Sequence, residues 1–409
     1  MRDYLPYPSC FPDEAEERFI KLILSSDAEF PGCWEEWKRS TVFDDIDQAT
    51  LRLLPLLDLR LRTLGMEDSE ISGRIRGVYK LVWLKNQRLL EEVRRTSELC
   101  QEAGIPILLL KGLSLLMNVY GDTGARFVGD GDILIHFEDL SKMFELLESH
   151  GWKGKYAVSL SAEDCRKCGF DRAIHAYTFR NDEGMELDLH WRAFHISPHK
   201  NIVRMLLLRD LPALPDQNTD QWQHSVAIKF KGTALRMLSL EDTLIHVIEH
   251  GAIGNPNRPL RWVADAAHII RKGSLDWDRI MEIVRESGLE IHARLAFRYL
   301  DERVQVAIPS RFMKALEQLP LTPKAIKDYY RVAELRPAAL GGFPILWYIY
   351  WKRESSHGLL AQCAGLPRYL RDAWEIEGEK SIRRYIFEKF RARFGLWLRL
   401  ESPRHYDGS

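Results

Sequence analysis

Two short acidic motifs constrain the fold of this chain more than any other feature of its sequence. Residues 126–135 read Arg-Phe-Val-Gly-Asp-Gly-Asp-Ile-Leu-Ile, so Asp130 and Asp132 stand two apart and lead into an apolar run. Asp188 lies in a second apolar segment, residues 186–191, which reads Glu-Leu-Asp-Leu-His-Trp. Alternate side chains of a β-strand share one face. Asp130 and Asp132 are therefore predicted to project together from the start of a buried strand, with Asp188 beside them if the two strands pair.

Three such carboxylates would form a cage of oxygen ligands of the kind that binds Mg²⁺. Two ions about 3.5–4 Å apart can hold both the attacking and the leaving oxygen of phosphoryl or nucleotidyl transfer. The competing interpretation is a charged turn before a strand, because Asp-x-Asp pairs are common. Asp45 and Asp47 form such a pair, and they are interpreted as the cap of a predicted helix. For Asp130 and Asp132 a metal site is favoured, since an apolar strand follows directly and a third acid recurs in a similar strand.

Composition indicates a globular protein of more than one domain. The chain has 409 residues, with 58 basic and 59 acidic side chains, so no global field marks it as a nucleic-acid binder. No apolar run reaches the roughly 18 residues of a membrane span, and the first residues lack the apolar core of a signal peptide. Of six cysteines only Cys165 and Cys168 have the spacing of a ligand pair, and no second pair completes a zinc site. These features predict a cytoplasmic protein with reduced thiols.

Hydrophobic periodicity divides the chain into three parts. Helical spacing of apolar residues dominates the first 87 residues and returns from residue 239 onward. Between these parts lie segments typical of strands, at residues 105–110, 133–137, 173–180 and 185–191, and helices at 88–103, 113–120 and 138–150. We therefore predict an α+β protein with an N-terminal helical region at 1–87, a small mixed sheet with helices at 88–235, and a C-terminal helical domain at 236–409.

Six motifs follow one another between residues 110 and 265. They are Leu110-Lys111-Gly112, Arg126, Asp130-x-Asp132, Asp188-Leu189-His190-Trp191, Leu238-Ser239-x-Glu241-Asp242-x-x-x-His246-x-x-x-His250 and Arg261-Trp262-x-x-Asp265. In this order they resemble the uncharacterised nucleotidyltransferases of the polymerase-β-like superfamily, over roughly residues 15–400. The resemblance implies a small mixed sheet with helices on one side, fused to helical segments. It also implies an enzyme that moves a nucleoside monophosphate from an NTP, such as ATP, to an acceptor hydroxyl and releases pyrophosphate.

The resemblance assigns roles to particular side chains. Asp130 and Asp132 would be ligands of both Mg²⁺ ions, and Asp188 would complete the ion that activates the acceptor hydroxyl. Lys111 and Arg126 are candidates to neutralise the triphosphate, because basic side chains stabilise charge on a transferring phosphoryl group. Arg126 is equally a candidate to pair with an active-site acid.

Two departures from the family pattern leave a catalytically inactive nucleotide- or partner-binding module as the alternative. Gly112 and Ser114 are candidates to hold the triphosphate, Gly112 through its backbone N–H, but their loop lies further upstream of the acids than the family pattern expects. A simple turn between a strand and a helix explains Gly112 equally well. Gly131 stands between the acids where family members carry an apolar residue, and glycine weakens a strand. His190 and His175 are candidates to orient the acceptor or an acid, or histidines packed at the sheet edge.

The expected partners are an NTP and an acceptor that is a protein, a peptide or a small molecule, since near-neutral charge argues against a nucleic-acid acceptor. A regulatory, antitoxin-like transferase that modifies a partner protein is a further alternative. His246 and His250 have a spacing that suits a metal, but polar residues facing another helix explain them more simply. Aromatic and basic residues in 347–353 and 383–393 suit nucleic acid or a membrane surface, although alternating buried and solvated faces explain them more simply.

Overall fold

The computed structural model describes most of the chain between residues 5 and 330. The described residues are 5–8, 10–67, 69–154, 176–194, 219–252, 260–323, 325–326 and 329–330. His175, the pair Cys165 and Cys168, and the aromatic and basic segments after residue 346 lie outside them.

Helices form both ends of the described chain. The N-terminal elements are α1 (Glu14–Leu24), α2 (Phe30–Ser40), η1 (Phe43–Asp45), α3 (Gln48–Leu51), α4 (Leu54–Thr63) and α5 (Glu70–Glu102). The central helical elements are α6 (Lys111–Leu115), η2 (Leu116–Tyr120), η3 (Phe137–Asp139), α7 (Leu140–Ser149) and α11 (Thr219–Gln223). The C-terminal elements are α12 (Leu240–Ala252), α13 (Arg261–Lys272), α14 (Trp277–Ser287), α15 (Glu290–Glu302) and α16 (Ser310–Gln318).

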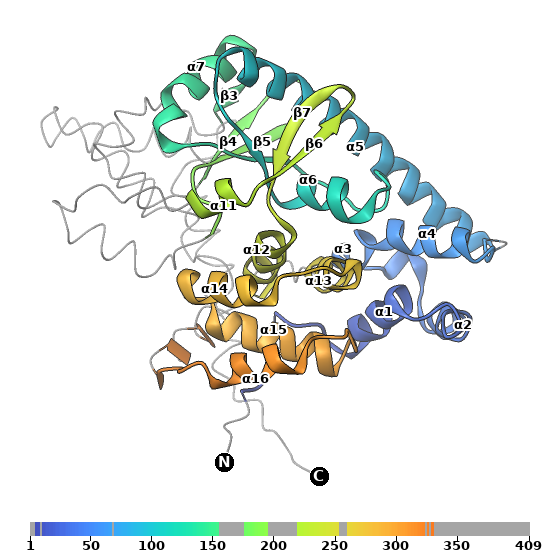
Figure 1. The fold of residues 1–409 in the computed structure, drawn as a ribbon. Coiled ribbons are helices and arrows are strands. Elements are labelled where there is room, and N and C mark those ends of the chain that lie inside the picture. Colours follow the sequence, from blue (N-terminus) through green and yellow to red (C-terminus); the bar gives the residue numbers. More distant parts are fainter. Residues whose placement is uncertain are drawn as a thin grey trace, which may run out of the picture.

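Seven strands of the described chain form one mixed sheet (Figure 1). They are β1 (Leu108–Leu109), β2 (Gly131–Leu134), β3 (Lys153–Gly154), β4 (Ala176–Arg180), β5 (Glu186–His190), β6 (Val226–Phe230) and β7 (Thr233–Met237). Their order across the sheet is β3-β4-β5-β2-β1-β7-β6. Strands β2 and β5 are parallel, as are β1 and β7, and the other neighbours are antiparallel. This mixed sheet between helical parts confirms the α+β fold class.

The hairpin of β4 and β5 joins two of the predicted strands, those at residues 173–180 and 185–191, but the hairpin of β6 and β7 was not expected. Its turn consists of Lys231 and Gly232, whose φ angles are 46° and 92°. Positive φ at both central residues is the geometry of the tight turns that join adjacent strands. Val226, Ile228 and Phe230 alternate with Ala227 and Lys229 along β6, so the pattern of a strand is present in the sequence although the strand is largely exposed.

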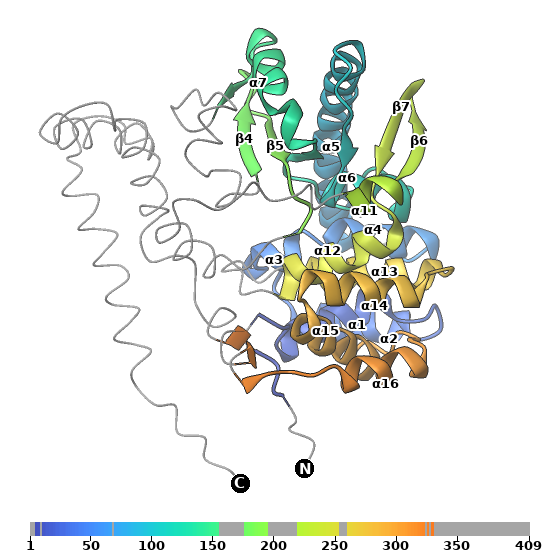
Figure 2. The same ribbon diagram turned by 60° about the vertical axis from the view of Figure 1, so that its left-hand side comes forward.

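The longest helix of the described chain, α5, crosses the sheet (Figure 2). A separate helix was expected to begin at residue 88, whereas α5 begins at Glu70 and is capped by Ser69, which accepts a hydrogen bond from the backbone N–H of Ser72 at 3.2 Å. Gly73 and Gly77 interrupt the apolar pattern of its first half, and tertiary packing overrides their low helix propensity. The predicted boundary at residue 87 falls inside α5, and the division into three domains stays a prediction. Despite the 33 residues of α5, no helix among the described residues has both the length and the apolar character to cross a bilayer.

The acids before α3 serve its start, as predicted. The carboxylate of Asp47 accepts hydrogen bonds from the backbone N–H groups of Ala49 at 2.6 Å and Thr50 at 2.8 Å. Asp45 lies in the short helix η1. The pair is therefore a local feature of two helix termini, because capping satisfies N–H groups that have no partner within the helix.

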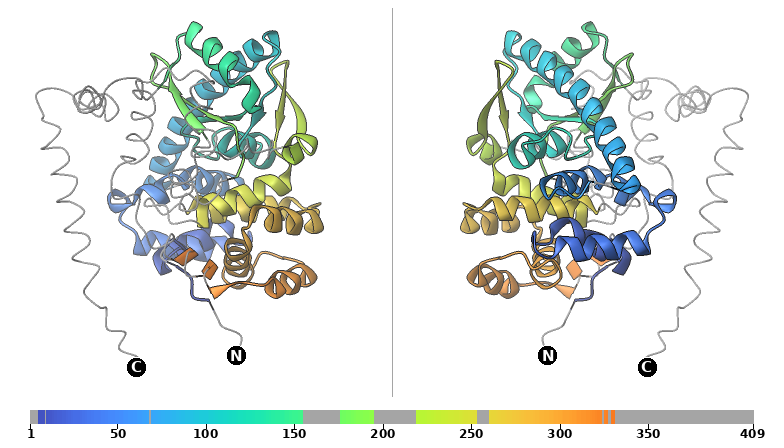
Figure 3. Two further views of the ribbon diagram at one scale, coloured as in Figure 1. Left: turned by 90° about the vertical axis from the view of Figure 1, so that its left-hand side faces the viewer. Right: turned by 90° about the vertical axis from the view of Figure 1, so that its right-hand side faces the viewer.

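The described residues form two large hydrophobic cores and a small cluster that includes Leu108, Leu134 and Leu238. Figure 3 shows in two views the helices and strands that enclose the cores. The first core lies between the sheet and the helices α5 and α7, with Val93, Met143 and Leu189 among its fully buried side chains. The second core is entirely helical. It joins α1 near the N-terminus to α12, α13 and α15, so segments far apart in sequence complete one apolar interior.

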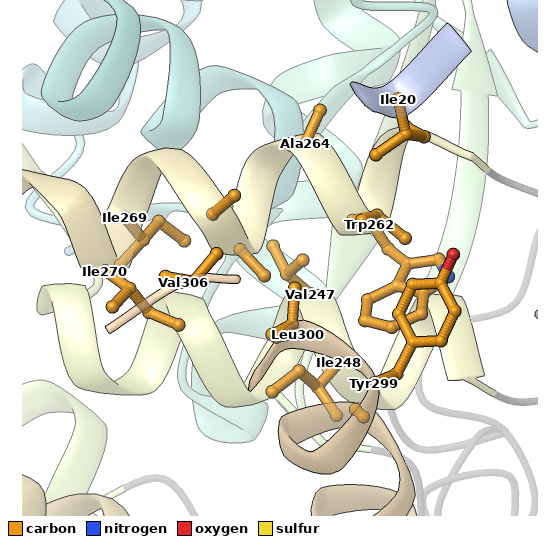
Figure 4. Close-up of a cluster of buried hydrophobic side chains, with 14 of the residues drawn as sticks. Ile20, Val247, Ile248, Trp262, Ala264, Ile269, Ile270, Tyr299, Leu300 and Val306 are labelled. Atoms are coloured by element: carbon orange, nitrogen blue, oxygen red, sulfur yellow. The ribbon is translucent and has the colours of Figure 1, made fainter. Parts of the chain in front are cut away.

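Figure 4 shows the centre of the helical core, where Ile20 of α1 lies near Trp262 of α13 and Tyr299 of α15. Helices α12 and α13 approach closely because Gly251 has no side chain. A Cβ atom on Gly251 would lie 2.2 Å from Cβ of Trp262. This contact holds α13 at the position from which it reaches the functional site described next.

Candidate functional site

Strands β2 and β5 bring two of the predicted acids side by side in the interior of the sheet. In this parallel pair Asp132 lies opposite Asp188. Gly131 faces α5, since a Cβ atom there would lie 3.0 Å from Cδ1 of Leu187 and 3.2 Å from Cγ2 of Val93. Because successive side chains alternate, Asp132 and Asp188 project from the opposite face of the sheet.

Asp132, Asp188 and His190 form a cluster that we call the acidic cluster. One ligand atom from each of the three lies within 4.8 Å of the others. Nε2 of His190 is 3.0 Å from Oδ1 of Asp132, and both side chains are almost fully buried. Asp188 is half-buried, and the hydroxyl of Thr178 on β4 donates a hydrogen bond to its Oδ1 at 2.6 Å. Two carboxylates and an imidazole at this separation can together hold a divalent cation.

Lys111 neutralises the acidic cluster. Its Nζ lies 2.5 Å from Oδ1 of Asp132 and 3.3 Å from Nε2 of His190. Burial lowers the pKa of Lys111, but the carboxylates of Asp132, Asp188 and Asp130 outweigh burial and hold it above its usual value. Lys111 has a φ of 43°, a conformation that a side chain with a Cβ adopts only at a free-energy cost.

The same contacts set the charges of Asp132 and His190. Burial alone would raise the pKa of Asp132, yet Lys111 and His190 hold it well below its usual range, so the carboxylate is ionised. Burial and the ammonium of Lys111 lower the pKa of His190. A neutral imidazole is the form that coordinates metals.

Asp130, the third predicted acid, stands outside the acidic cluster. It precedes β2 and is half-buried. Burial and the charge of Asp132 raise its pKa to about 6. The structure therefore places Asp130 close enough to Asp132 for the two charges to interact, whereas His190 takes the third position of the cluster.

Arg126 forms an ion pair with Asp265, an acid to which the sequence alone assigned no role. Its Nε and Nη2 donate to Oδ1 and Oδ2 of Asp265 on α13, each at 2.8 Å. The hydroxyl of Tyr120 also donates to Oδ1 of Asp265, at 2.7 Å. Burial lowers the pKa of Arg126, but Asp265 outweighs it and the guanidinium stays charged. This buried pair fastens the loop before β2 to the C-terminal helices.

The positions of Gly112 and Ser114 follow from the packing of α6. A Cβ atom on Gly112 would lie 2.8 Å from Cγ1 of Val128 and 2.9 Å from Nη1 of Arg126, so only glycine allows this approach. Ser114 is fully buried, and its hydroxyl lies 3.4 Å from that of Thr243 on α12. Their predicted contact with a triphosphate stays a prediction.

A cavity of about 430 Å³, which includes space open to solvent, adjoins the acidic cluster through Lys111. It lies among α6, α12 and α13 and is rich in basic side chains. The basic residues in its lining are Lys111, Arg126, Arg261 and the histidines His246 and His250, and one acid, Asp265, lines it as well. His246 and His250 thus line the cavity from successive turns of α12.

A comparison with known protein families identifies the family of this chain. The family model described as an uncharacterised nucleotidyltransferase matches residues 49–305, which is more than half of the chain. The chain belongs to this family. The matched segment contains the whole described sheet and the helices α12 to α15. It therefore includes α6, α12 and α13, which line the cavity.

Other comparisons are weaker. No curated protein matches the chain. The chain is similar to the crystal structure of an antigenic nucleotidyltransferase-like protein from Paracoccidioides brasiliensis, with 15% sequence identity and a TM-score of 0.27. That similarity covers 56% of this chain and 93% of the other. At this TM-score the likeness carries no argument about the site.

Proposed function

We propose that the chain is a metal-dependent nucleotidyltransferase that moves a nucleoside monophosphate from an NTP to an acceptor hydroxyl. The observation that carries the proposal is the acidic cluster beside a basic cavity, in a chain of the nucleotidyltransferase family. In the reaction, the acceptor oxygen forms a bond to the α-phosphorus while the bond to pyrophosphate breaks. The hydroxyl proton passes to Asp188, whose Oδ1 is already oriented by Thr178.

The donor set of the acidic cluster fits a divalent cation. Asp132 and Asp188 would bind it through carboxylate oxygens and His190 through Nε2. Asp130 is assigned to a second ion, shared with Asp132. Carboxylates suit Mg²⁺ and Mn²⁺, whereas imidazole suits transition metals, so Mn²⁺ joins Mg²⁺ as an expected ion. When bound, the cation supplies the positive charge that favours ionisation of the acceptor hydroxyl and stabilises charge on the transferred group.

The cavity among α6, α12 and α13 is proposed to take the NTP. Lys111 lies at the boundary between the cavity and the acidic cluster, so its ammonium is placed to meet phosphate oxygens next to the metal ligands. Arg126 contributes through Nη1, which also donates to the carbonyl oxygen of Phe127 at 3.3 Å, since Asp265 occupies its Nε and Nη2. Gly112 supports this arrangement by leaving room for the Arg126 guanidinium. Ser114, buried against Thr243, holds α6 to α12.

The test combines labelling with metal binding. The chain is incubated with each labelled NTP, Mg²⁺ or Mn²⁺, and a cell lysate, and the labelled molecule is identified. Asp132→Asn and Asp188→Asn should abolish labelling and weaken Mn²⁺ binding in calorimetry. Asp182→Asn is the matched control, because this acid is 79% exposed at the β4–β5 turn and pairs with the exposed Lys153. Undiminished labelling by Asp132→Asn would contradict the proposal.

An inactive nucleotide-binding module is the second candidate. The observation in its favour is that Lys111 already neutralises the charge of Asp132, so the site is less negative before any ion binds. Under this alternative the wild-type chain would bind NTP in calorimetry but label no acceptor with either metal.

A further inference from the structure

Three cations surround the aromatic ring of Phe127. The charged groups of Arg52, Lys85 and Arg261 lie 5.5, 4.5 and 6.0 Å from its centroid. We call these three residues the basic cluster. Phe127 is half-buried and belongs to the loop that leads into Asp130, so the basic cluster stands next to the acids of the site.

The basic cluster is assembled by the tertiary fold. Arg52 follows α3, Lys85 lies within α5, and Arg261 begins α13. Nη1 of Arg261 donates a hydrogen bond to the carbonyl oxygen of Phe127 at 2.9 Å, which fixes this arginine against the loop. Segments from the N-terminal helices, the sheet domain and the C-terminal helices therefore converge on one spot.

The basic cluster makes no ion pair with the described acids, although Asp265 and Asp130 lie near enough to Arg261 to attract it. Among the described residues, no carboxylate lies within ion-pair distance of Arg52, Lys85 or Arg261. Neighbouring arginines of α4 and α5 do have acidic partners, as in Arg60, Arg62, Arg74, Arg76, Arg88 and Arg94. The chain carries 59 acidic and 58 basic residues, so a scarcity of acids does not explain the difference.

The three cations also repel one another. Burial, and then the nearby guanidinium of Arg126, lowers the pKa of Arg261 to about 10; Arg52 acts in the same direction, whereas Asp265 and Asp130 act against it. Gathering like charges around one ring costs free energy that cation–π contacts offset only partly. An anion bound among them would remove this repulsion.

We propose that the basic cluster binds one phosphate group carried by a small acceptor molecule. A phosphate monoester carries close to two negative charges and offers several oxygens to the planar donor groups of Arg52 and Arg261. The assignment to an acceptor rests on the proposed transferase function, because Arg261 also lines the cavity beside the acidic cluster. A phosphate held there would place the rest of the acceptor near Asp130 and Asp188.

The surroundings favour a single phosphate over a polyanion. A polyanion requires a row of free cations that follows its backbone. Arg76 and Arg88, the nearest arginines on either side of Lys85 in α5, are both paired with acids. Lys80, an exposed lysine between Arg76 and Lys85, is a single further cation, so the free positive charge of this stretch is greatest around Phe127.

The test compares two double variants with equal changes in charge. Arg52→Gln/Lys85→Gln removes two members of the basic cluster, while Arg39→Gln/Lys80→Gln removes two exposed cations that lie outside it. Calorimetry at low ionic strength measures the affinity for inorganic phosphate, for acetate, and for an NTP analogue with a methylene bridge between its α- and β-phosphates. Thermal melting shows that each variant is folded.

Loss of two charge-assisted contacts should weaken phosphate binding at least about tenfold in Arg52→Gln/Lys85→Gln, with no change in the control. Affinity for the NTP analogue should be equal in all three proteins. Unchanged phosphate affinity, or acetate bound as tightly as phosphate, would overturn the phosphate site. A parallel loss of analogue affinity would assign the basic cluster to the NTP and overturn its role in the acceptor.

Two further outcomes separate this inference from the proposed function. A wild-type chain that binds phosphate at the basic cluster but no NTP analogue would overturn the transferase, and with it the link to an acceptor. Glucose 6-phosphate and a phosphoserine peptide serve as additional probes. Tighter binding of the peptide would overturn the assignment to a small molecule, whereas tighter binding of the sugar phosphate would support it.

Discussion

The ammonium nitrogen of Lys111 lies 2.5 Å from Oδ1 of Asp132, so the most buried acid of the site is neutralised by a lysine whose backbone has a φ of 43°. If the acids of the site only repelled one another, removing one of them would cost little stability. The pairing reverses that expectation for Asp132, because a buried carboxylate and its cation depend on each other.

Lys111→Met should therefore destabilise the metal-free protein by about 3 kcal/mol, since it leaves the carboxylate of Asp132 buried without its cation. Adding Asp132→Asn to Lys111→Met should restore a large part of this loss. Urea unfolding in the presence of EDTA measures both changes. Equal stability of Lys111→Met and the wild type would show that the pair does not form in solution.

Asp130→Asn should have a pH-dependent effect of the opposite sign. Burial and Asp132 raise the pKa of Asp130 to about 6, so folding resists its ionisation. Its contribution to stability is complete below pH about 4, where the unfolded chain is also protonated, and is lost as the pH rises through 6. The variant should exceed the wild type by roughly 1–3 kcal/mol at pH 8 and match it near pH 4. Melting temperatures across this range test it, and Asp182→Asn should show no such gain.

Arg126→Met should cost about 3–5 kcal/mol in stability, because it strands the buried carboxylate of Asp265. Arg126→Met/Asp265→Leu should cost less than the single change, and a double-mutant cycle measures the coupling. The exposed pair of Arg88 and Glu183 is the control, for which Arg88→Met should cost at most about 1 kcal/mol. Loss of NTP affinity without loss of stability would instead favour a purely phosphate-binding role for Arg126.

Gly131→Ala should destabilise the chain by about 1–3 kcal/mol, because the new methyl group would press on Leu187 and Val93 across the first core. Adding Val93→Ala to Gly131→Ala should relieve part of this cost, because it removes one of the side chains that the new methyl group meets. Gly129→Ala is a matched control two residues away, since a Cβ atom there would meet only Cε1 of Phe127 at 3.6 Å. Thermal melting of the three variants is sufficient. Equal losses from the changes at 129 and 131 would contradict the steric explanation.

The sequence predicted the features that depend on strand periodicity. The alternation of apolar and acidic residues placed Asp132 and Asp188 on one face, and the structure pairs them in register. The turn at residues 181–184 sets the register of β4 against β5, so Thr178 lies opposite Asp188. The position of this turn was sufficient to predict the pairing, although no role was assigned to Thr178. Gly131 was interpreted as a weakness of the strand, whereas the structure explains it by the close approach of α5.

Contacts between distant segments could not be predicted in the same way. The partner of Arg126 is Asp265, 139 residues further along the chain, and no local pattern specifies such a distance. His190, and not Asp130, is the third member of the acidic cluster, because β2 begins at Gly131 and Asp130 lies before the strand. Strand starts are the least certain part of a prediction from periodicity. The hairpin of β6 and β7 was missed although Val226, Ile228 and Phe230 give its first strand the alternation of apolar residues that predicts a strand.

The shared helical core has a consequence for how the chain acquires its structure during synthesis. Helix α1 packs with α13 and α15, and the hydroxyl of Tyr7 donates a hydrogen bond to Glu302 across 295 residues of sequence. The ribosome therefore releases the N-terminal helices long before the surfaces that cover them exist. Phe19, Ile20 and their neighbours are buried only after α15 has been synthesised, so shorter nascent chains expose an apolar surface. Chaperone binding to such intermediates should end when α15 emerges.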